Sequence, residues 1–466
     1  MFDRRLTWMV VLPWLVGCSL NAELSKPAPG IPGQWPGESA AQAGSATIEP
    51  HPVPWREFYT HPLLRRMIDA SLENNRDLRA AAARMEKAAA LLGLAGSAGL
   101  PTLQADGGHQ ASRTPADLSS TGQAAISHRE DMGLSLPAFE LDLRGRLASL
   151  EESARANYLA SSEAAYAVRV VLISQVVETY ISWREMVERS VLAQAALSIQ
   201  QESRDLARKR VGAGVTQAQT DLRAAMVLEG MRADLAESRR QESLAFNALR
   251  LLTGTEPDPS WTWPTLAELD LMGRMRLALP DRVLTLRPDV RAAEQRLLGA
   301  NANIDAARAA FWPRILLTTS VGSASQALGG LFGSGSMAWS FVPRIDLPIF
   351  DFSRRQNELA AAEAERKALL AEYEKVVQQS FREVADALTS RGVLEERLKA
   401  LTATRDAQKG RVVLIDKRYR AGLDSRQSLL DAQQELHANE QQLCMARARL
   451  LINQIQFFKA LGGGVS

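Results

Sequence analysis

The chain has 466 residues, of which 46% are hydrophobic and 23% are charged. The 55 basic and 53 acidic residues leave a formal charge of +2, so composition gives no reason to expect a nucleic-acid partner. The length allows two or three domains. Only two cysteines are present, Cys18 and Cys444, and no intramolecular disulfide is expected because the first has another predicted role.

Residues 1–17 predict an export signal. Arg4 and Arg5 precede a mostly apolar stretch, 6–16, which is too short to span a bilayer as a permanent helix. The stretch ends in the letters LVGC, which are similar to a bacterial lipoprotein signal. That similarity implies cleavage before Cys18 and lipidation of its thiol. An ordinary signal peptide with a chance cysteine, or a buried N-terminal helix, are the alternatives.

The segment 18–54 is predicted to be an extended linker that follows the lipid anchor. It is rich in Pro, Gly, Ala and Ser, a composition that favours an extended, weakly structured chain. Ser19 follows the cysteine directly, which by resemblance to lipoproteins favours sorting to the outer membrane. No later stretch contains about 18 consecutive apolar residues, so no transmembrane helix is predicted.

Two internally similar units make up the rest of the chain. The stretch KRVGAGV at 209–215 returns as KRYRAGL at 417–423, and RDLRAAAARM at 76–85 lines up with PDVRAAEQRL at 288–297. The repetition predicts a duplicated half-molecule. Its parts are a first repeat at 55–256, a linking segment at 257–280 and a second repeat at 281–466.

Each repeat is predicted to contain a helix, two strands and a long helical hairpin. The hairpin arms lack proline and are rich in Ala, Leu, Glu, Arg and Gln, which favour helix. In the first repeat we expect a helix at 62–98, strands within 102–110 and 132–139, and hairpin arms at 147–211 and 217–253. In the second we expect a helix at 281–311, strands at 314–323 and 338–350, and arms at 353–419 and 425–461.

The tips of both hairpins are predicted at the repeated glycines. Gly214 and Gly422 are expected to adopt a positive φ that ends one helix and reverses the chain. Thr216 and Asp424 are then expected to cap the helices that follow. A long coiled coil is the alternative for these helical segments taken alone.

The second-repeat strands alternate apolar and polar side chains over about ten residues, which is typical of membrane-spanning barrel strands. The first-repeat strands are weaker: 132–139 alternates, but 102–110 barely does. A soluble antiparallel sheet would show a similar pattern. Four strands cannot close a barrel, and open sheet edges are not tolerated in lipid, so the membrane interpretation requires several chains. Three chains is the smallest number that leaves room for a passage.

Several longer stretches resemble the TolC-type outer membrane efflux factors, in the lipoprotein branch of the OprM-like and NodT-like channels. They include LRPDVRAAEQRLLGANANIDAARAAFWP (286–313), RYRAGLDSRQSLLDAQ (418–433) and KALGGG (459–464). The resemblance implies a mainly α fold with a small membrane β part. Duplicated helical hairpins would form an α-barrel tunnel, and four strands per chain would contribute to a trimeric 12-stranded β-barrel.

The resemblance also implies function and partners. The protein would be the outer membrane exit duct of a tripartite pump for drugs or other small molecules, working as a homotrimer without a cofactor. It would dock on a periplasmic adaptor protein linked to an inner-membrane transporter of RND or MFS type. By position, the adaptor-contacting residues are Arg210, Gly214, Val215, Thr216, Arg418, Gly422, Leu423, Asp424 and Ser425. Solvated helix ends are the alternative for the two arginines.

A periplasmic gate is expected on the helix after the second tip. The resemblance places the family pattern G-x-x-x-x-L-x-x-x-D-x-x-R on Gly422, Gln427, Asp431 and Gln434. The carboxylate is kept, but glutamine replaces both the leucine and the arginine. Loss of the apolar side chain removes a constriction that gates by dewetting, so we expect a looser and more cation-tolerant gate. Pairing of Asp431 with a neighbouring helix is the alternative.

No catalytic pattern stands out in the sequence. The five histidines do not pair at metal-ligand spacing, and there is no phosphate-binding loop or nucleophile elbow. An enzyme is therefore not predicted. The other functions to weigh are a type I protein-secretion channel and a lipid-anchored periplasmic coiled-coil scaffold.

Overall fold

The computed structural model describes residues 32, 35, 54–257, 261–269, 271 and 280–464. The predicted signal peptide 1–17, the predicted lipidation site Cys18 and nearly all of the segment 18–54 lie outside this range. The chain divides into two compact units. The first contains residues 1–28, 84–161 and 292–373, and the second contains residues 29–83, 162–291 and 374–466.

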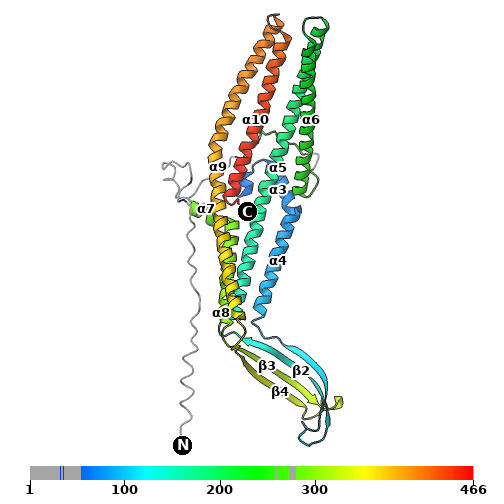
Figure 1. The fold of residues 1–466 in the computed structure, drawn as a ribbon, viewed down its shortest axis with the longest axis vertical. Coiled ribbons are helices and arrows are strands. Elements are labelled where there is room, and N and C mark those ends of the chain that lie inside the picture. The colour runs from blue at the N-terminus through cyan, green and yellow to red at the C-terminus, as the bar shows by residue number, and fades with distance from the viewer. Residues whose placement is uncertain are drawn as a thin grey trace. The chain divides into compact units, whose positions relative to one another are not determined.

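A four-stranded antiparallel sheet dominates the first unit, in the order β1-β2-β3-β4 (Figure 1). The strands are β1 (Gln104–Thr114), β2 (Ala125–Leu141), β3 (Arg314–Ser325) and β4 (Met337–Asp346), and a 3-10 turn, η2 (Leu328–Gly330), lies between β3 and β4. All four predicted strands are therefore present. The prediction that the last strand continues to residue 350 is wrong, because β4 ends before Pro348, which has no backbone N–H to donate to a ladder.

The sheet has one mainly apolar face and one mainly polar face. Leu134 lies opposite Val321, which lies opposite Trp339, and side chains directly opposite one another share a face. The same face carries Met132, Leu136, Leu317, Phe341 and Ile345. The other face carries Asp106, Ser112, Ser127, Ser135, Ser320, Ser340 and Arg344. The predicted alternation is thus clear in β3, β4 and the second half of β2, whereas β1 has few apolar side chains on either face.

Polar residues interrupt the apolar face near the loop between β1 and β2, among them His109, Arg113, His128 and Glu130. His109 and Glu130 lie directly opposite one another, and the Nδ1 atom of His109 lies 2.6 Å from Oε1 of Glu130. The carboxylate of Glu130 is nearly buried. Because each group satisfies the other, the interruption leaves no unpaired carboxylate on this face.

Long helices build most of the second unit and extend into the first (Figure 1). The helices are α2 (Trp55–Phe58), α3 (Pro62–Asn74), α4 (Arg76–Ser97), α5 (Arg146–Gly212), α6 (Ala218–Thr253), α7 (Pro280–Leu286), α8 (Pro288–Ala309), α9 (Arg354–Arg420) and α10 (Arg426–Ala460). The incoming arms α5 and α9 both have 67 residues, and the outgoing arms have 36 and 35. Each arm agrees with its predicted range to within one residue at either end.

The opening helix of each repeat is two helices, so the prediction of one continuous helix is wrong. In the first repeat the break is at Asn75, whose Oδ1 accepts hydrogen bonds from the N–H groups of Asp77 (2.9 Å) and Leu78 (3.1 Å). Asn75 thereby caps α4. In the second repeat the break is at Arg287, which precedes Pro288, and a residue before proline avoids the helical conformation.

The main hydrophobic core lies in the second unit. Trp55, Phe58 and Tyr59 are fully buried, and the ring of Phe58 stacks on Phe458 with centroids 4.4 Å apart. Buried side chains of α5 complete this core, among them Ile173, Val176, Val177, Tyr180 and Ile181. Burying an aliphatic or aromatic side chain of this size contributes about 1.5–3 kcal/mol each, so the core fixes the middle of α5.

One residue of the predicted linker packs against the body. Trp35 is 3% exposed, and its ring stacks on Phe381 of α9 with centroids 5.0 Å apart. Val283 and Phe457 belong to the same small cluster. Among the described residues of the segment 18–54, Trp35 therefore packs against the second unit, and Pro54 forms a backbone bridge with Gly464.

Helix α5 is the one helix in the described residues that is long and apolar enough to cross a membrane. The sequence count of consecutive apolar residues had predicted none. Its qualifying window is 44% buried inside the protein. We therefore interpret this apolar stretch as the part of α5 that supplies the main core.

Candidate functional site

Both hairpin tips have the same backbone geometry. Gly214 and Gly422 each have φ of 73°, as predicted. At the first tip the N–H of Val215 donates to the carbonyl of Arg210 at 2.9 Å, and at the second tip Leu423 donates to Arg418 at 2.9 Å. A Cβ at either glycine would meet no atom within 4 Å, so glycine is required by the left-handed backbone and not by lack of space.

The predicted adaptor-contacting residues lie on or beside these turns. Val215 is 65% exposed and Leu423 is 68% exposed, so each tip presents one exposed apolar side chain beside its turn. The exposed members of the set are Arg210, Gly214, Val215, Arg418, Gly422, Leu423 and Ser425, and the half-buried members are Thr216 and Asp424. The tips thus present a small apolar side chain on a rigid turn.

The predicted helix caps are wrong. The residue before α6 is Gln217, whose side chain makes no capping bond, and Thr216 Oγ1 is buried without a hydrogen bond among the described residues. Ser425 caps α10, and its Oγ accepts from the N–H of Ser428 at 3.1 Å. Asp424 instead accepts two hydrogen bonds from Arg418, at 2.7 and 3.3 Å. These bonds raise the pKa of the Arg418 guanidinium above its ordinary value.

Ser425→Ala is expected to destabilise the start of α10 by about 1 kcal/mol, because the N–H of Ser428 loses its acceptor. Amide hydrogen exchange in the first turn of α10 should accelerate by roughly fivefold. Thr216→Val is the matched control and should leave exchange at the start of α6 unchanged. Faster exchange in the Thr216 variant alone would show that Thr216 caps α6, as was predicted from the sequence.

The three predicted gate residues lie on α10, and two of them are bonded to α5. The Nε2 atom of Gln427 donates to Asp431 Oδ1 at 2.8 Å and to Ser203 Oγ at 3.1 Å. The amide of Gln434 donates to Gln200 Oε1. Asp431 is therefore held by a glutamine of its own helix, and the described contacts do not pair it with a neighbouring helix.

The strongest bond between the two hairpins at this level was not predicted from sequence. Arg426 donates to both carboxylate oxygens of Glu202 on α5, at 2.5 and 2.7 Å. These hydrogen bonds lower the pKa of Glu202 below its ordinary value. Arg426 and Glu202 lie in different repeats, so no local pattern joins them.

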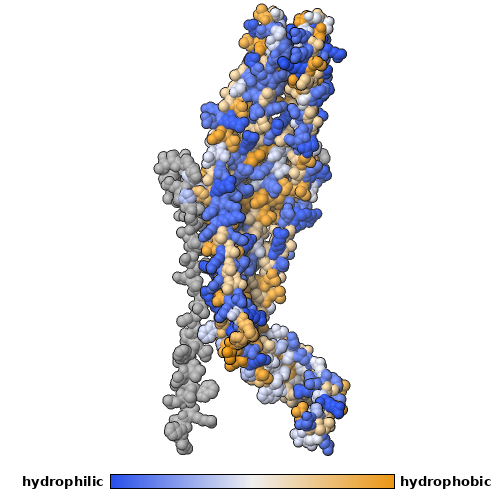
Figure 2. Space-filling view, viewed as in Figure 1, coloured by the Kyte–Doolittle hydropathy of each residue, from blue (hydrophilic) through white to orange (hydrophobic). Residues whose placement is uncertain are grey.

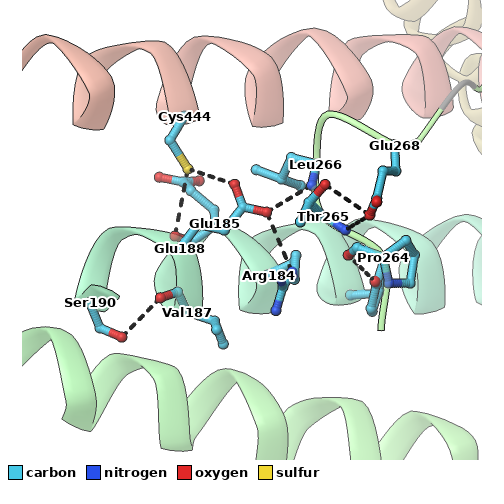
Figure 3. A network of polar contacts seen from close by, with 11 residues as sticks. Arg184, Glu185, Val187, Glu188, Ser190, Pro264, Thr265, Leu266, Glu268 and Cys444 are labelled. Carbon is cyan, nitrogen blue, oxygen red and sulfur yellow. Dashed lines mark hydrogen bonds and ion pairs between the residues drawn. The ribbon is translucent and has the colours of Figure 1, made fainter. Parts of the chain in front are cut away.

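A second polar network holds the segment between the repeats against α5 and α10. Figure 3 shows Cys444 pointing toward Glu185 and Glu188 of α5. Its Sγ lies 3.8 Å from the Glu185 carbonyl oxygen and 3.7 Å from Glu188 Oε2, while Glu188 Oε1 accepts from the Leu266 N–H at 2.8 Å. Burial, followed by the charges of Glu188 and Glu185, raises the pKa of the Cys444 thiol to about 12.

Cys444 is expected to resist alkylation in the folded protein. The thiolate is the reactive form, and with a pKa of about 12 it is scarcely populated at pH 8. Maleimide should therefore modify Cys444 only after denaturation, as read by peptide mass spectrometry. Cys444→Ser provides the control for labelling elsewhere. Rapid labelling of the native protein at pH 8 would contradict the buried geometry.

An exposed apolar surface lies where β4 leads into α9 in the first unit. Figure 2 shows apolar side chains gathered at this end of the sheet. Ile349 is 91% exposed, Phe350 is 77% exposed and Phe352 is 84% exposed. An exposed patch of this kind marks contact with a membrane or with another protein.

The described residues contain no arrangement that points to catalysis. No group of three or more His, Cys, Asp or Glu side chains within the described ranges is placed to hold a metal ion. Four strands with one apolar face and two unpaired edges, together with two long hairpins, define instead a subunit of an assembled membrane channel.

The chain belongs to the outer membrane efflux protein family, whose profile matches residues 67–255 and 279–463. It is 40% identical to the solvent efflux pump outer membrane protein SrpC of Pseudomonas putida, over 98% of each chain. It is 37% identical to the outer membrane protein OprJ of Pseudomonas aeruginosa, over 97% of this chain and 94% of that protein.

The fold is similar to that of a solved outer membrane channel. The open state of the MtrE channel of Neisseria gonorrhoeae matches with a TM-score of 0.85 and 32% identity, covering 96% of this chain and 99% of that one. The resemblance to TolC-type efflux factors is thereby confirmed. The protein is an outer membrane channel component of an efflux pump.

Proposed function

We propose that three copies of this chain form a passive exit duct across the outer membrane. The observation that carries the proposal is the sheet, which has an apolar face and leaves β1 and β4 unpaired on their outer edges within the chain. Unpaired strand edges are not tolerated in lipid, and three copies would join them into a closed barrel of twelve strands wide enough for a passage.

The helical part is proposed to form the periplasmic tunnel. The two repeats, 55–256 and 281–466, each supply one hairpin, and the segment 257–280 joins them. Cys18 is proposed to carry the lipid that anchors the chain to the outer membrane. The exposed tips, centred on Val215 and Leu423, are proposed to dock on a periplasmic adaptor that is coupled to an inner-membrane transporter of RND or MFS type.

The transported molecules are proposed to be small, like the solvents named for a relative that is 40% identical. Energy coupling and choice of cargo are proposed to belong to the transporter and adaptor, with this chain acting as a passive channel.

The proposal is tested with detergent-extracted protein from outer membranes. Without heating, the protein should migrate in electrophoresis as a trimer that heat converts to monomer, and it should give ion-conducting steps in a planar bilayer. A monomer without conductance would contradict the duct and favour a periplasmic scaffold.

Gln427→Leu is expected to reduce single-channel conductance severalfold. In the wild type, the amide of Gln427 is hydrogen-bonded to Ser203 and Asp431, which supports a polar character for the proposed gate. A leucine would lose both bonds and restore an apolar ring that dewets. Gln433→Leu is the control, since it makes the same chemical change at a position of α10 that lies outside these contacts. Equal conductance in the wild type and in Gln427→Leu would refute the polar gate.

A further inference from the structure

The two tips share a backbone but differ in how their charges are used. At the first tip, Arg208, Lys209 and Arg210 are exposed and form no ion pair with any described residue. Arg223, on the helix that follows, is also exposed without an ion pair in the described part of the chain. Asp205 is the single exposed acidic side chain close by in sequence without an ion pair to a described residue. The first tip therefore carries an excess of unneutralised positive charge.

At the second tip nearly every basic side chain is neutralised. Arg418 is bonded to Asp424 at 2.7 Å, Arg420 lies 2.8 Å from Asp416, and Arg426 is bonded to Glu202 at 2.5 Å. Lys417 is the basic residue of this tip for which no described ion partner is found. The charges of the second tip are thus used within the protomer, and little is left to attract a partner.

The helix dipole does not account for this difference. Basic residues in the last turn interact favourably with the C-terminal end of a helix, and α5 and α9 both carry them there. The dipole explains why both helices end in basic residues. It does not explain why one set is paired with carboxylates and the other is left open.

Each tip also exposes one apolar side chain beside its turn, Val215 at the first and Leu423 at the second. A buried apolar anchor surrounded by a polar rim is the usual anatomy of a protein interface. The two tips therefore offer similar anchors, but only the first has a rim of free positive charge.

We propose that the first tip is the electrostatic seat for an acidic partner, the negatively charged end of an adaptor's helical hairpin. The second tip contacts the adaptor through Leu423 and its turn, while its charges tie the two hairpins of the protomer together. This inference rests on the proposed function, because it presupposes that the tips dock on an adaptor. Attraction of this kind raises the association rate and falls as salt screens it.

The probes are two designed helical-hairpin peptides that are identical except near the turn, where one carries glutamates and the other glutamines. Binding to the full-length trimer in nanodiscs is measured by biolayer interferometry at about 50 and about 500 mM salt. The wild type should bind the glutamate hairpin at least about tenfold more tightly than its twin at low salt, and the difference should vanish at high salt.

Two charge reversals identify the seat. Arg208→Glu with Lys209→Glu should remove the preference for glutamate, whereas Lys417→Glu with Arg420→Glu makes the same charge change at the second tip and should retain most of it. Arg208 and Lys209 are exposed and unpaired among the described residues, so their reversal should leave folding and conductance intact. An equal loss in both variants, or equal binding of the two hairpins to the wild type, would overturn the inference.

Conductance separates this inference from the proposed function. A wild-type trimer that conducts but shows no preference between hairpins contradicts only the acidic seat. A wild type that neither assembles nor conducts contradicts the duct itself, whatever the hairpins do.

Discussion

Gly322→Val is expected to abolish the outer-membrane trimer. Gly322 of β3 lies directly opposite Gly133 of β2, and the two backbones approach closely at this point. A Cβ at 322 would lie 2.5 Å from the Cα of Gly133 and would overlap the carbonyl oxygen of Met132. Backbone cannot move aside as a flexible side chain can, so the cost is on the order of 4 kcal/mol or more. Heat-modifiable trimer in outer-membrane fractions measures the loss.

Gly107→Val is the matched control for this variant. Gly107 lies in β1 of the same sheet, and a Cβ there would come no closer than 3.9 Å to the carbonyl oxygen of Asp131. This is an ordinary van der Waals contact, so trimer yield should stay near that of the wild type. If both valine variants assemble equally well, then β2 and β3 do not pair in the register described.

Arg287→Met is expected to destabilise the second unit by about 1–3 kcal/mol, chiefly because the buried carbonyl of Ala460 loses its donor. Arg287 is 5% exposed, and its guanidinium donates to Asp289 (3.0 and 2.7 Å), to Glu383 (2.8 Å) and to the carbonyl of Ala460 (2.8 Å). It thereby joins α7, α8, α9 and the end of α10. Burial alone would lower the pKa of this group, but its bonds to the two carboxylates raise it. The midpoint of urea denaturation of the trimer should fall accordingly.

Arg291→Met serves as the control for charge removal one turn further along α8. Arg291 is half-exposed, with its guanidinium 3.6 Å from Glu163, and exposed ion pairs contribute about 0–1 kcal/mol. Its denaturation midpoint should therefore change little. A small effect at Arg287 as well would mean that these four helices are held together by packing and not by this arginine.

Features governed by local chemistry could be predicted from the sequence. The long arms follow from stretches without proline, and the turns at Gly214 and Gly422 follow from glycine in a repeated motif. The second-repeat strands follow from alternation, whereas β1 barely alternates and β2 begins at Ala125, in a stretch where histidine and acidic residues obscure the pattern. The internal repeat strengthened these predictions, because each weak sequence signal occurred in both repeats.

Features that depend on residues far apart in the chain could not be predicted. Asn75 ends α3 because its side chain also donates to Leu252, and Arg426 pairs with Glu202 of the other repeat. The packing of Trp35 on α9 could not be predicted, because the composition of its segment suggested only a linker. Two signals were nevertheless available: Pro288 marks the start of α8, and Ser425, which is as good a cap residue as aspartate, stands directly before α10.

The stacking of Trp35 on Phe381 limits how far from the helical part a lipid carried by Cys18 could lie. Position 35 lies seventeen residues after position 18, and a fully extended chain of that length covers at most about 60 Å. A fatty acid carried by Cys18 would have to enter the bilayer within that radius of the tryptophan. The stacked rings would then attach this segment to α9. Shortening the segment between Cys18 and Trp35 would either pull the helical part toward the lipid or detach the tryptophan ring from α9.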